Sequence, residues 1–243
     1  MELRDRVALV TGAGRRVGRA IALALAGRGM RVALHYHRSA DGARETMTEI
    51  ALLGGTSVML QADLAQPHAP GALAAQVVER FGTLDVLVNS AAVMLRTPFG
   101  EVTPGDWDGM FALNLRAPFF LTQAAAPHLR RDGGAVVNIA DLAAFETWPG
   151  YVPHGISKSG VVQMTRALAR VLAPDVRVNA VAPGAVLLPE EWPEESAARL
   201  ARTTPLGRLG SPDDVVRAVI YLLDADYVTG ETLVVDGGRH VRA

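Results

Sequence analysis

The sequence predicts an α/β protein built on one doubly wound parallel sheet with helices on both faces. Short apolar runs of strand length alternate with longer segments of helical period along the chain. Several of these short runs are apolar throughout, as in strands that are covered by helices on both faces. No linker or internal repeat divides the chain, so we expect a single domain over residues 1–243.

In the first half of the chain, each predicted strand is followed by a predicted helix or by a turn. The run 6–10 is rich in β-branched residues and ends in a glycine turn that leads into an alanine-rich helix. Gly27 and Gly29 mark the end of that helix, and Gly54 and Gly55 close the next one. The strands are expected at residues 6–10, 31–35, 57–61 and 84–89, and the helices at 17–29, 40–53 and 73–81.

The second half continues the alternation with longer helices. Strands are expected at residues 135–140, 176–180 and 232–235, and helices at 107–129, 155–172 and 213–223. Residues 186–208 break the rhythm with three prolines, at 189, 193 and 205, and four glutamates, at 190, 191, 194 and 195. This stretch is either a flap over a substrate site or an ordinary solvated helical insertion.

Composition excludes several classes of function. The formal net charge is −1, so we expect no nucleic-acid partner. The chain has no cysteine, which excludes disulfides, thiolate catalysis and cysteine-ligated metals, and we expect no metal cofactor. No apolar run approaches the ~20 residues that span a bilayer. The N-terminal residues predict a strand rather than a signal peptide, so we expect a cytoplasmic protein without membrane contact.

The segment Thr-Gly-Ala-Gly-Arg-Arg-Val-Gly, residues 11–18, has the context of a dinucleotide-binding loop. It lies between the first strand and an alanine-rich helix. A glycine turn there lets the backbone approach a pyrophosphate, and the helix N-terminus offers free N–H groups. Arg16 would reach the pyrophosphate or the substrate; the alternative is a solvated surface arginine. The cofactor contacts expected from this loop are Gly12, Arg15, Arg16 and Val17.

The residues after the second strand favour NADPH over NADH. Folds that bind NAD usually place an acidic residue there to hold the ribose hydroxyls. Here the segment reads His-Tyr-His-Arg-Ser, and the first carboxylate is Asp41. His37, Arg38 and Ser39, with Arg15, would instead donate hydrogen bonds to a 2′-phosphate. After the third strand, Asp63-Leu64 would accept from the adenine amino group.

Four polar residues form a candidate catalytic set. His154 and Lys158 are four residues apart in a predicted helix and therefore share a face. Asp141 directly follows the strand 135–140, on the carboxyl side of the sheet where ligands bind, and Asn114 lies inside the long helix. A hydride acceptor needs a nearby proton donor and a positive charge that tunes it. The alternative is that His154 is a surface histidine near a helix start.

Taken together, the motifs resemble the short-chain dehydrogenase/reductase family over nearly the whole chain. They are the loop TGAGRRVG, Asp63-Leu64, DVLVNSAA, Asn114, NIAD, Ser157-Lys158, VRVNAVAPG and the VDGG ending. Within the family the chain is most similar to pteridine reductases, through Arg16 in place of the middle loop glycine, the HYHRSA segment, and Asp141 where most members have serine. The resemblance implies a Rossmann-type fold, NADPH-dependent reduction and a homotetramer. It implies a catalytic set of Asn114, Asp141, His154 and Lys158, and a cofactor lining of Arg16, His37, Arg38, Ser39, Asp63, Asn89, Ala91, Lys158, Pro183 and Gly184.

Two residues depart from the family pattern. The family tyrosine that donates the proton, four residues before the lysine, is His154 here. The aromatic residue that stacks on the pterin in pteridine reductases corresponds to Met94, which packs on flat rings but has no π-face. Tyr151 is close in sequence, but we expect it to point elsewhere.

Several roles for His154 are open from sequence. If Asp141 holds the imidazole charged, His154 is the acid of an NADPH-dependent reductase of a C=O or C=N bond, with a pterin-like substrate as one option. Alternatively, Asp141 delivers the proton itself or through a water. A further alternative is an NADPH-binding protein with weak or absent hydride transfer, and another is a histidine introduced to disable a reductase.

The expected substrate pocket is apolar and suits a flat or hydrophobic small molecule. It would be built by the loops 94–99 and 142–151 and by residues 187–192. The alternative role for Trp148 and Trp192 is packing in the core or at a subunit interface. The helices 107–129 and 155–172 would pair with copies of themselves in an oligomer. The expected substrate contacts are Arg16, Met94, Phe145, Trp148, Leu187 and Trp192.

Overall fold

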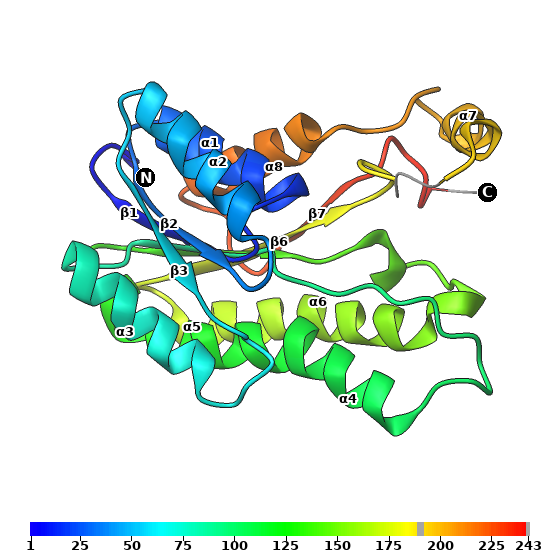
Figure 1. Cartoon of the computed structure of the whole chain (residues 1–243), viewed down its shortest axis with the longest axis horizontal. Coiled ribbons are helices and arrows are strands. Elements are labelled where there is room, and N and C mark those ends of the chain that lie inside the picture. The colour runs from blue at the N-terminus through cyan, green and yellow to red at the C-terminus, as the bar shows by residue number, and fades with distance from the viewer. Residues whose placement is uncertain (189–191, 242–243) are drawn as a thin grey trace.

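The computed structural model describes residues 1–188 and 192–241, and it confirms one parallel sheet between two helical layers (Figure 1). The seven strands run in the order β3-β2-β1-β4-β5-β6-β7. This order reverses between β1 and β4, which is where ligands bind in open parallel sheets. The strands are β1 (Val7–Val10), β2 (Arg31–Tyr36), β3 (Ser57–Gln61), β4 (Val86–Asn89), β5 (Ala135–Ile139), β6 (Arg177–Pro183) and β7 (Thr232–Val235).

Helices cover both faces of the sheet, so strand residues are buried on either side. In β1, Ala8 and Val10 belong to the core under α1 and α8, whereas Val7 and Leu9 belong to the core under α3 and α5. Figure 1 shows α1, α2 and α8 above the sheet and α3, α4, α5 and α6 below it. The helices are α1 (Arg16–Gly27), α2 (Ala40–Leu52), α3 (Ala69–Phe81), α4 (Pro104–Phe111), α5 (Ala117–Leu129), α6 (Val152–Leu172), α7 (Glu194–Thr203) and α8 (Pro212–Asp224).

The helices differ from the sequence prediction mainly at their starts. Both α3 and α6 begin a few residues earlier than predicted, and each has proline, Pro70 or Pro153, in its first turn. Proline fits that position because the first N–H groups of a helix have no intrahelical partner. The long helix predicted over 107–129 begins at Pro104 and is interrupted by a π-helical turn, Ala112–Arg116.

The irregular stretch 186–208 contains a helix, α7, which has no buried residue. This agrees with the helical insertion named above and leaves the flap untested. Three residues of the stretch, Pro189, Glu190 and Glu191, lie outside the described residues. In Figure 1, α7 lies at the far end of the molecule from β1.

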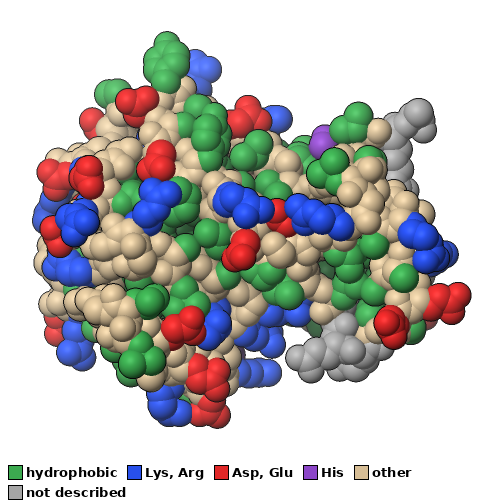
Figure 2. Space-filling model, turned by 90° about the horizontal axis from the view of Figure 1, so that it is seen from above, with side chains coloured by type: hydrophobic (Ala, Val, Ile, Leu, Met, Phe, Trp, Pro, Cys, Tyr) green, Lys and Arg blue, Asp and Glu red, His purple; other side chains and the backbone are tan. Residues whose placement is uncertain are grey.

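Charged side chains of both signs are intermixed on the face seen in Figure 2, which is the upper side of Figure 1. Within residues 1–188 and 192–241, no helix is both long and apolar enough to cross a membrane. No cluster of metal-ligating side chains occurs in the same part of the chain.

Helix α2 rests directly on the backbone of the glycine turn. A Cβ atom at Gly42 would lie 2.1 Å from the carbonyl oxygen of Gly14. Real Cβ atoms do not approach so closely, so the absence of a side chain at Gly42 sets the position of α2 against the turn. Gly109 in α4 is the opposite case, because a Cβ atom added there would have no neighbouring atom within 4 Å.

We expect Gly42→Ala and Gly109→Ala to change stability in opposite directions. Alanine at position 42 must push the glycine turn away from α2 and should lower the free energy of unfolding by about 1–3 kcal/mol. Alanine at position 109 meets open space and should raise it by about 0.5–1 kcal/mol through helix propensity. Urea unfolding monitored by circular dichroism measures both changes, and equal destabilisation by the two variants would contradict the packing argument.

Candidate active site

The turn after β1 is tied to the loop after β4 by a buried threonine. The hydroxyl oxygen of Thr11 accepts the backbone N–H groups of Ser90 and Ala91, both at 2.9 Å. Gly12 has a φ of +70°, and a Cβ there would lie 3.2 Å from Cα of Ala91. A Cβ at Gly18 would lie 2.3 Å from the carbonyl oxygen of Gly12, so the start of α1 touches the turn. These contacts form the backbone cradle that a pyrophosphate requires.

His35 holds the same turn from β2. Its Nδ1 lies 3.2 Å from the N–H of Gly12 and its Nε2 lies 3.1 Å from the carbonyl oxygen of Ala62. Since an N–H can only donate and a carbonyl can only accept, the ring is neutral with its proton on Nε2. Burial lowers the pKa of His35 to about 4, which agrees with a neutral ring. The carbonyl oxygen of His35 also accepts the N–H of Ala13.

Arg16 connects the turn to the segment after β6. It is a non-glycine residue in the left-handed region, with a φ of +53°, and its guanidinium donates to the carbonyl oxygen of Leu187. Its neighbour Arg15 is the exposed N-cap of α1, and Val17 packs on the core under that helix. The two substrate-site residues predicted at 16 and 187 are therefore in direct contact.

The residues expected near a 2′-phosphate gather at the ends of β2 and β3. His37 and Arg38 are exposed after β2, and Nδ1 of His37 lies 3.9 Å from Oδ1 of Asp63. A hydrogen bond from Gln66 lowers the pKa of Asp63, and the charges of His37 and Arg38 act in the same direction. Ser39 is the residue before α2, and it packs against Gly14 of the turn. Asp63 is therefore an ionised carboxylate that lies beside the basic side chains of His37 and Arg38.

The other predicted cofactor residues lie along the carboxyl edges of β3, β4 and β6. Asn89 uses its side-chain amide inside the protein, donating to Oδ1 of Asn138 at 2.8 Å. Pro183 ends β6, and the N–H of Gly184 donates to Val235 at 2.9 Å. Ala91 contacts the glycine turn, and Leu64 is buried in the core under α3 and α5.

The π-helical turn presents Asn114 to the loop after β4. Its Oδ1 accepts the N–H of Val93, and its Nδ2 donates to the carbonyl oxygen of Val93, both at 2.9 Å. Nδ2 also lies 3.1 Å from the hydroxyl oxygen of Ser157 in α6. Asn114 therefore fixes the peptide groups of Val93 between two helices. π-Helical turns are frequent at functional sites for this kind of placement.

His154, Asp141 and Lys158 are brought together as the sequence predicts. His154 is buried in the first turn of α6, with Nε2 3.6 Å from Oδ2 of Asp141 and Nδ1 3.3 Å from the carbonyl oxygen of Val93. Lys158 is buried one turn later and donates to the carbonyl oxygen of Ile139 at 2.8 Å. Burial lowers the pKa of Lys158 to about 8, although Asp141 opposes this shift. The set can hold both a proton and a positive charge in a shielded place.

Two of the predicted substrate loops contact each other. The N–H of Thr97 donates to the carbonyl oxygen of Gly150 at 2.9 Å, which joins loop 94–99 to loop 142–151. Met94, Phe145 and Trp192 are all exposed. The ring of Trp148 meets that of Tyr151 edge-on at 6.3 Å. Since the ring of Tyr151 packs on Trp148, it does not replace His154 in the buried cluster.

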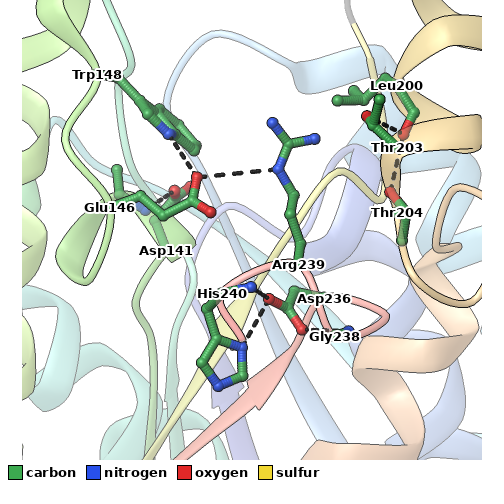
Figure 3. Close-up of polar contacts among 11 residues, drawn as sticks. Asp141, Glu146, Trp148, Leu200, Thr203, Thr204, Asp236, Gly238, Arg239 and His240 are labelled. Atoms are coloured by element: carbon green, nitrogen blue, oxygen red, sulfur yellow. Dashed lines mark hydrogen bonds and ion pairs between the residues drawn. The ribbon is translucent and has the colours of Figure 1, made fainter. Parts of the chain in front are cut away.

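A group near these loops was missed by sequence reasoning. Figure 3 shows Arg239, from the turn after β7, reaching toward Glu146, with Nε of Arg239 3.9 Å from Oε2 of Glu146. The same carboxylate accepts the indole N–H of Trp148 at 2.9 Å. Arg239 follows Gly237 and Gly238 in the sequence, and nothing in this local pattern indicated a contact with Glu146. His35 was also missed, although a histidine inside the apolar strand VALHY is a detectable exception.

Comparison with known proteins gives consistent matches over almost the whole chain. A family model described as enoyl-(acyl carrier protein) reductase matches residues 12–240. The chain is 35% identical over 240 residues to the 3-oxoacyl-[acyl-carrier-protein] reductase FabG of Staphylococcus aureus, covering 96% of this chain and 98% of that protein.

Two solved structures are similar in fold and sequence. The angucycline C-6 ketoreductase LanV with bound NADP has a TM-score of 0.93 and 34% identity, covering 99% of this chain and 98% of LanV. A blue fluorescent protein from a metagenomic library, in complex with NADPH, has a TM-score of 0.92 and 34% identity, covering 98% of this chain and 99% of that one. None of these proteins is a pteridine reductase, so that closer resemblance stays a prediction.

We expect two substitutions of His35 to separate cofactor binding from general stability. Asparagine places an oxygen near the position of Nδ1 and keeps the acceptor for Gly12, whereas glutamine places an amide near Nε2 and keeps the donor to Ala62. Each variant loses one buried hydrogen bond and should lose about 1 kcal/mol of stability. Only His35→Gln should weaken NADPH binding, by about tenfold, measured by NADPH fluorescence titration. Equal weakening in both variants would reduce His35 to a packing residue.

Proposed function

The chain belongs to the short-chain dehydrogenase/reductase family, and we propose that it uses NADPH to reduce the carbonyl group of a small apolar molecule. The observation that carries the proposal is that the glycine cradle and the cluster of partly exposed Asp141 with buried His154 and Lys158 lie at the same carboxyl edge of the sheet. The similar proteins named above include a 3-oxoacyl reductase and a ketoreductase, which favours a ketone as the reducible group.

The residues of the cradle fit NADPH. Gly12, Gly14 and Gly18 leave no room for side chains between the turn and its neighbours, and α1 begins at the turn with free N–H groups for a pyrophosphate. His37 and Arg38 supply the positive charge for a 2′-phosphate. When bound, NADPH would supply the hydride that the substrate carbon receives. Lys158 donates one N–H to Ile139 and so keeps two for the ribose hydroxyls of the cofactor.

A pterin-like substrate is the second candidate. Arg16 and Asp141 favour it, because together they could hold the polar edge of a pterin ring. Met94 disfavours it, since methionine cannot stack as an aromatic ring does. The alternative to catalysis is an NADPH-binding protein in which the exchange of tyrosine for His154 has weakened or removed hydride transfer.

A second copy of the chain is the proposed occupant of an apolar groove on α4, α5 and α6. The groove runs across the three helices, and its three phenylalanines, at positions 111, 119 and 120, come from α4 and α5; Phe119 and Phe120 are exposed. Exposed phenylalanines on a helical face of this size are typical of subunit interfaces. The family resemblance supports a homotetramer, in which this groove would pair with its copy. The groove is lined by Asp108, Phe111, Ala112, Leu115, Arg116, Phe119, Phe120, Gly160, Met164, Ala167 and Leu168.

The proposed activity is tested by NADPH oxidation with a panel of cyclic and aromatic ketones and a dihydropterin, comparing the wild type with His154→Tyr. We expect ketone turnover by both proteins and at least about tenfold preference for NADPH over NADH, lost in Arg38→Ala because the 2′-phosphate loses its cation. Turnover only in His154→Tyr would favour the weakened reductase. If neither protein turned over any substrate while NADPH still bound, the binding-protein alternative would be favoured.

The proposed interface is tested by Phe120→Asp. A buried carboxylate in an apolar interface has no partner, so we expect the oligomer to dissociate. Light scattering coupled to size-exclusion chromatography measures the mass. Tyr221→Asp, at an exposed aromatic residue of α8 outside the groove, is the control and should leave the mass unchanged. An unchanged mass in Phe120→Asp would argue against this face as the interface.

A further inference from the structure

His154 is enclosed, and both of its ring nitrogens face oxygen atoms. Its side chain is 2% exposed, with Nδ1 3.3 Å from the carbonyl oxygen of Val93 and Nε2 3.6 Å from Oδ2 of Asp141. Nε2 is fully shielded and has no hydrogen-bond partner within residues 1–188 and 192–241. The protonation of the ring therefore depends on what these two oxygen atoms can accept or donate.

The carbonyl of Val93 requires the proton on Nδ1. The Asn114 side chain binds both the N–H and the carbonyl oxygen of Val93, so this carbonyl cannot easily turn away from the ring of His154. A carbonyl oxygen only accepts, and Nδ1 must therefore carry a hydrogen to make a favourable contact. In a neutral imidazole, Nε2 is then left as an unprotonated acceptor.

The carboxyl group of Asp141 faces this acceptor with another acceptor. Its Oδ1 already accepts the N–H of Ala143 at 2.8 Å, which leaves Oδ2 to face the ring. A neutral ring beside an ionised carboxylate would set two lone pairs against each other with Nε2 shielded from water, which is unfavourable. One additional proton between Nε2 and Oδ2 removes the conflict, either as imidazolium and carboxylate or as imidazole and carboxylic acid.

We propose that His154 and Asp141 together store one proton and that Asp141 transfers it to the substrate oxygen; this deepens the proposed carbonyl reduction and rests on it. The exposure of the two side chains decides which one meets the substrate. Asp141 is 26% exposed and His154 only 2%. Asp141 is thus the catalytic acid, and His154 is a positioning residue that shares the stored proton with it.

The transfer balances in protons and electrons. The carbonyl carbon gains the hydride, the π electron pair moves to the carbonyl oxygen, and that oxygen takes the proton from Oδ2 to give the alcohol. The pair is left as a neutral imidazole beside a carboxylate, and solvent restores the proton through the exposed side of Asp141. Lys158 is the charged group that acts on Asp141 from the next turn of α6, and it stabilises the carboxylate left behind.

Nuclear magnetic resonance tests the stored proton without any turnover. The cofactor-free protein is labelled with ¹⁵N in histidine rings and ¹³C in aspartate carboxyl groups, and its pH is varied. We expect one shared titration step at His154 and Asp141, absent from the ring in Asp141→Asn. His240 is an internal reference, because it contacts Asp236 at 2.8 Å but is exposed. A neutral ring beside an ionised carboxylate throughout pH 5–8 would overturn the proposal.

Kinetics tests which residue transfers the proton. Asp141→Asn should lower kcat by about 100-fold or more while NADPH affinity stays within about threefold. His154→Gln keeps a donor toward Asp141 but stores no proton, so the alkaline limb of its kcat profile should move toward acid by about two pH units, as a carboxyl replaces the coupled pair. Asp175→Asn, at an exposed carboxylate in a surface ion pair, is the control and should behave as wild type.

The outcomes distinguish failure of this inference from failure of the proposed function. If Asp141→Asn keeps more than about a tenth of wild-type turnover, the carboxyl group is not the acid and the inference is wrong, although carbonyl reduction stands. If neither the wild type nor His154→Tyr reduces any carbonyl, the proposed function fails, and the resonance experiment alone reports on the stored proton. An unchanged pH profile in His154→Gln would also overturn the positioning role.

Discussion

The arrangement of this protein's functional edge depends on direct contact between backbones around the glycine turn. The carbonyl oxygens of Gly12 and Gly14 lie where Cβ atoms would stand at Gly18 and Gly42, so α1 and α2 both rest on the turn without an intervening side chain. Thr11 extends this contact to the loop after β4, and His35 extends it to β3. If these backbones separated, the functional groups at the carboxyl ends of the strands would no longer be held in fixed positions relative to one another.

From that edge, polar contacts continue through the loop after β4 to α6 and to the end of β5. Asn114 fixes Val93, the carbonyl of Val93 orients His154, and His154 faces Asp141. Each of these groups is costly to bury alone, and each is tolerated because its neighbour satisfies it. The pair of His154 and Asp141 is the exception, since Nε2 has no partner among the described residues. An unsatisfied buried atom in an otherwise satisfied network is where chemistry is expected.

Sequence reasoning predicted the parallel sheet, the glycine turn and the meeting of Asp141, His154 and Lys158, because these features depend on local pattern and on strand ends. It placed Asn114 in a regular helix and missed the π-helical turn, since Ala112–Arg116 contains no glycine or proline that would mark an irregular turn. It also missed Arg239 beside Glu146, because that contact joins segments 93 residues apart, between positions 146 and 239. It left the role of His154 open, and only exposure and the orientation of both ring nitrogens distinguish it from Asp141.

The π-helical turn over Ala112–Arg116 has a consequence for how this chain can vary over evolution. Removing one residue there would restore a regular α-helix and rotate everything before it by about 100° relative to α5. Asn114 would then leave Val93, while the apolar faces of the helices on either side would no longer match. A substitution at Asn114 would remove only the contacts of that side chain, whereas an insertion or deletion of one residue would change the active site and the core together. The number of residues in this segment therefore constrains the structure separately from the identity of its side chains.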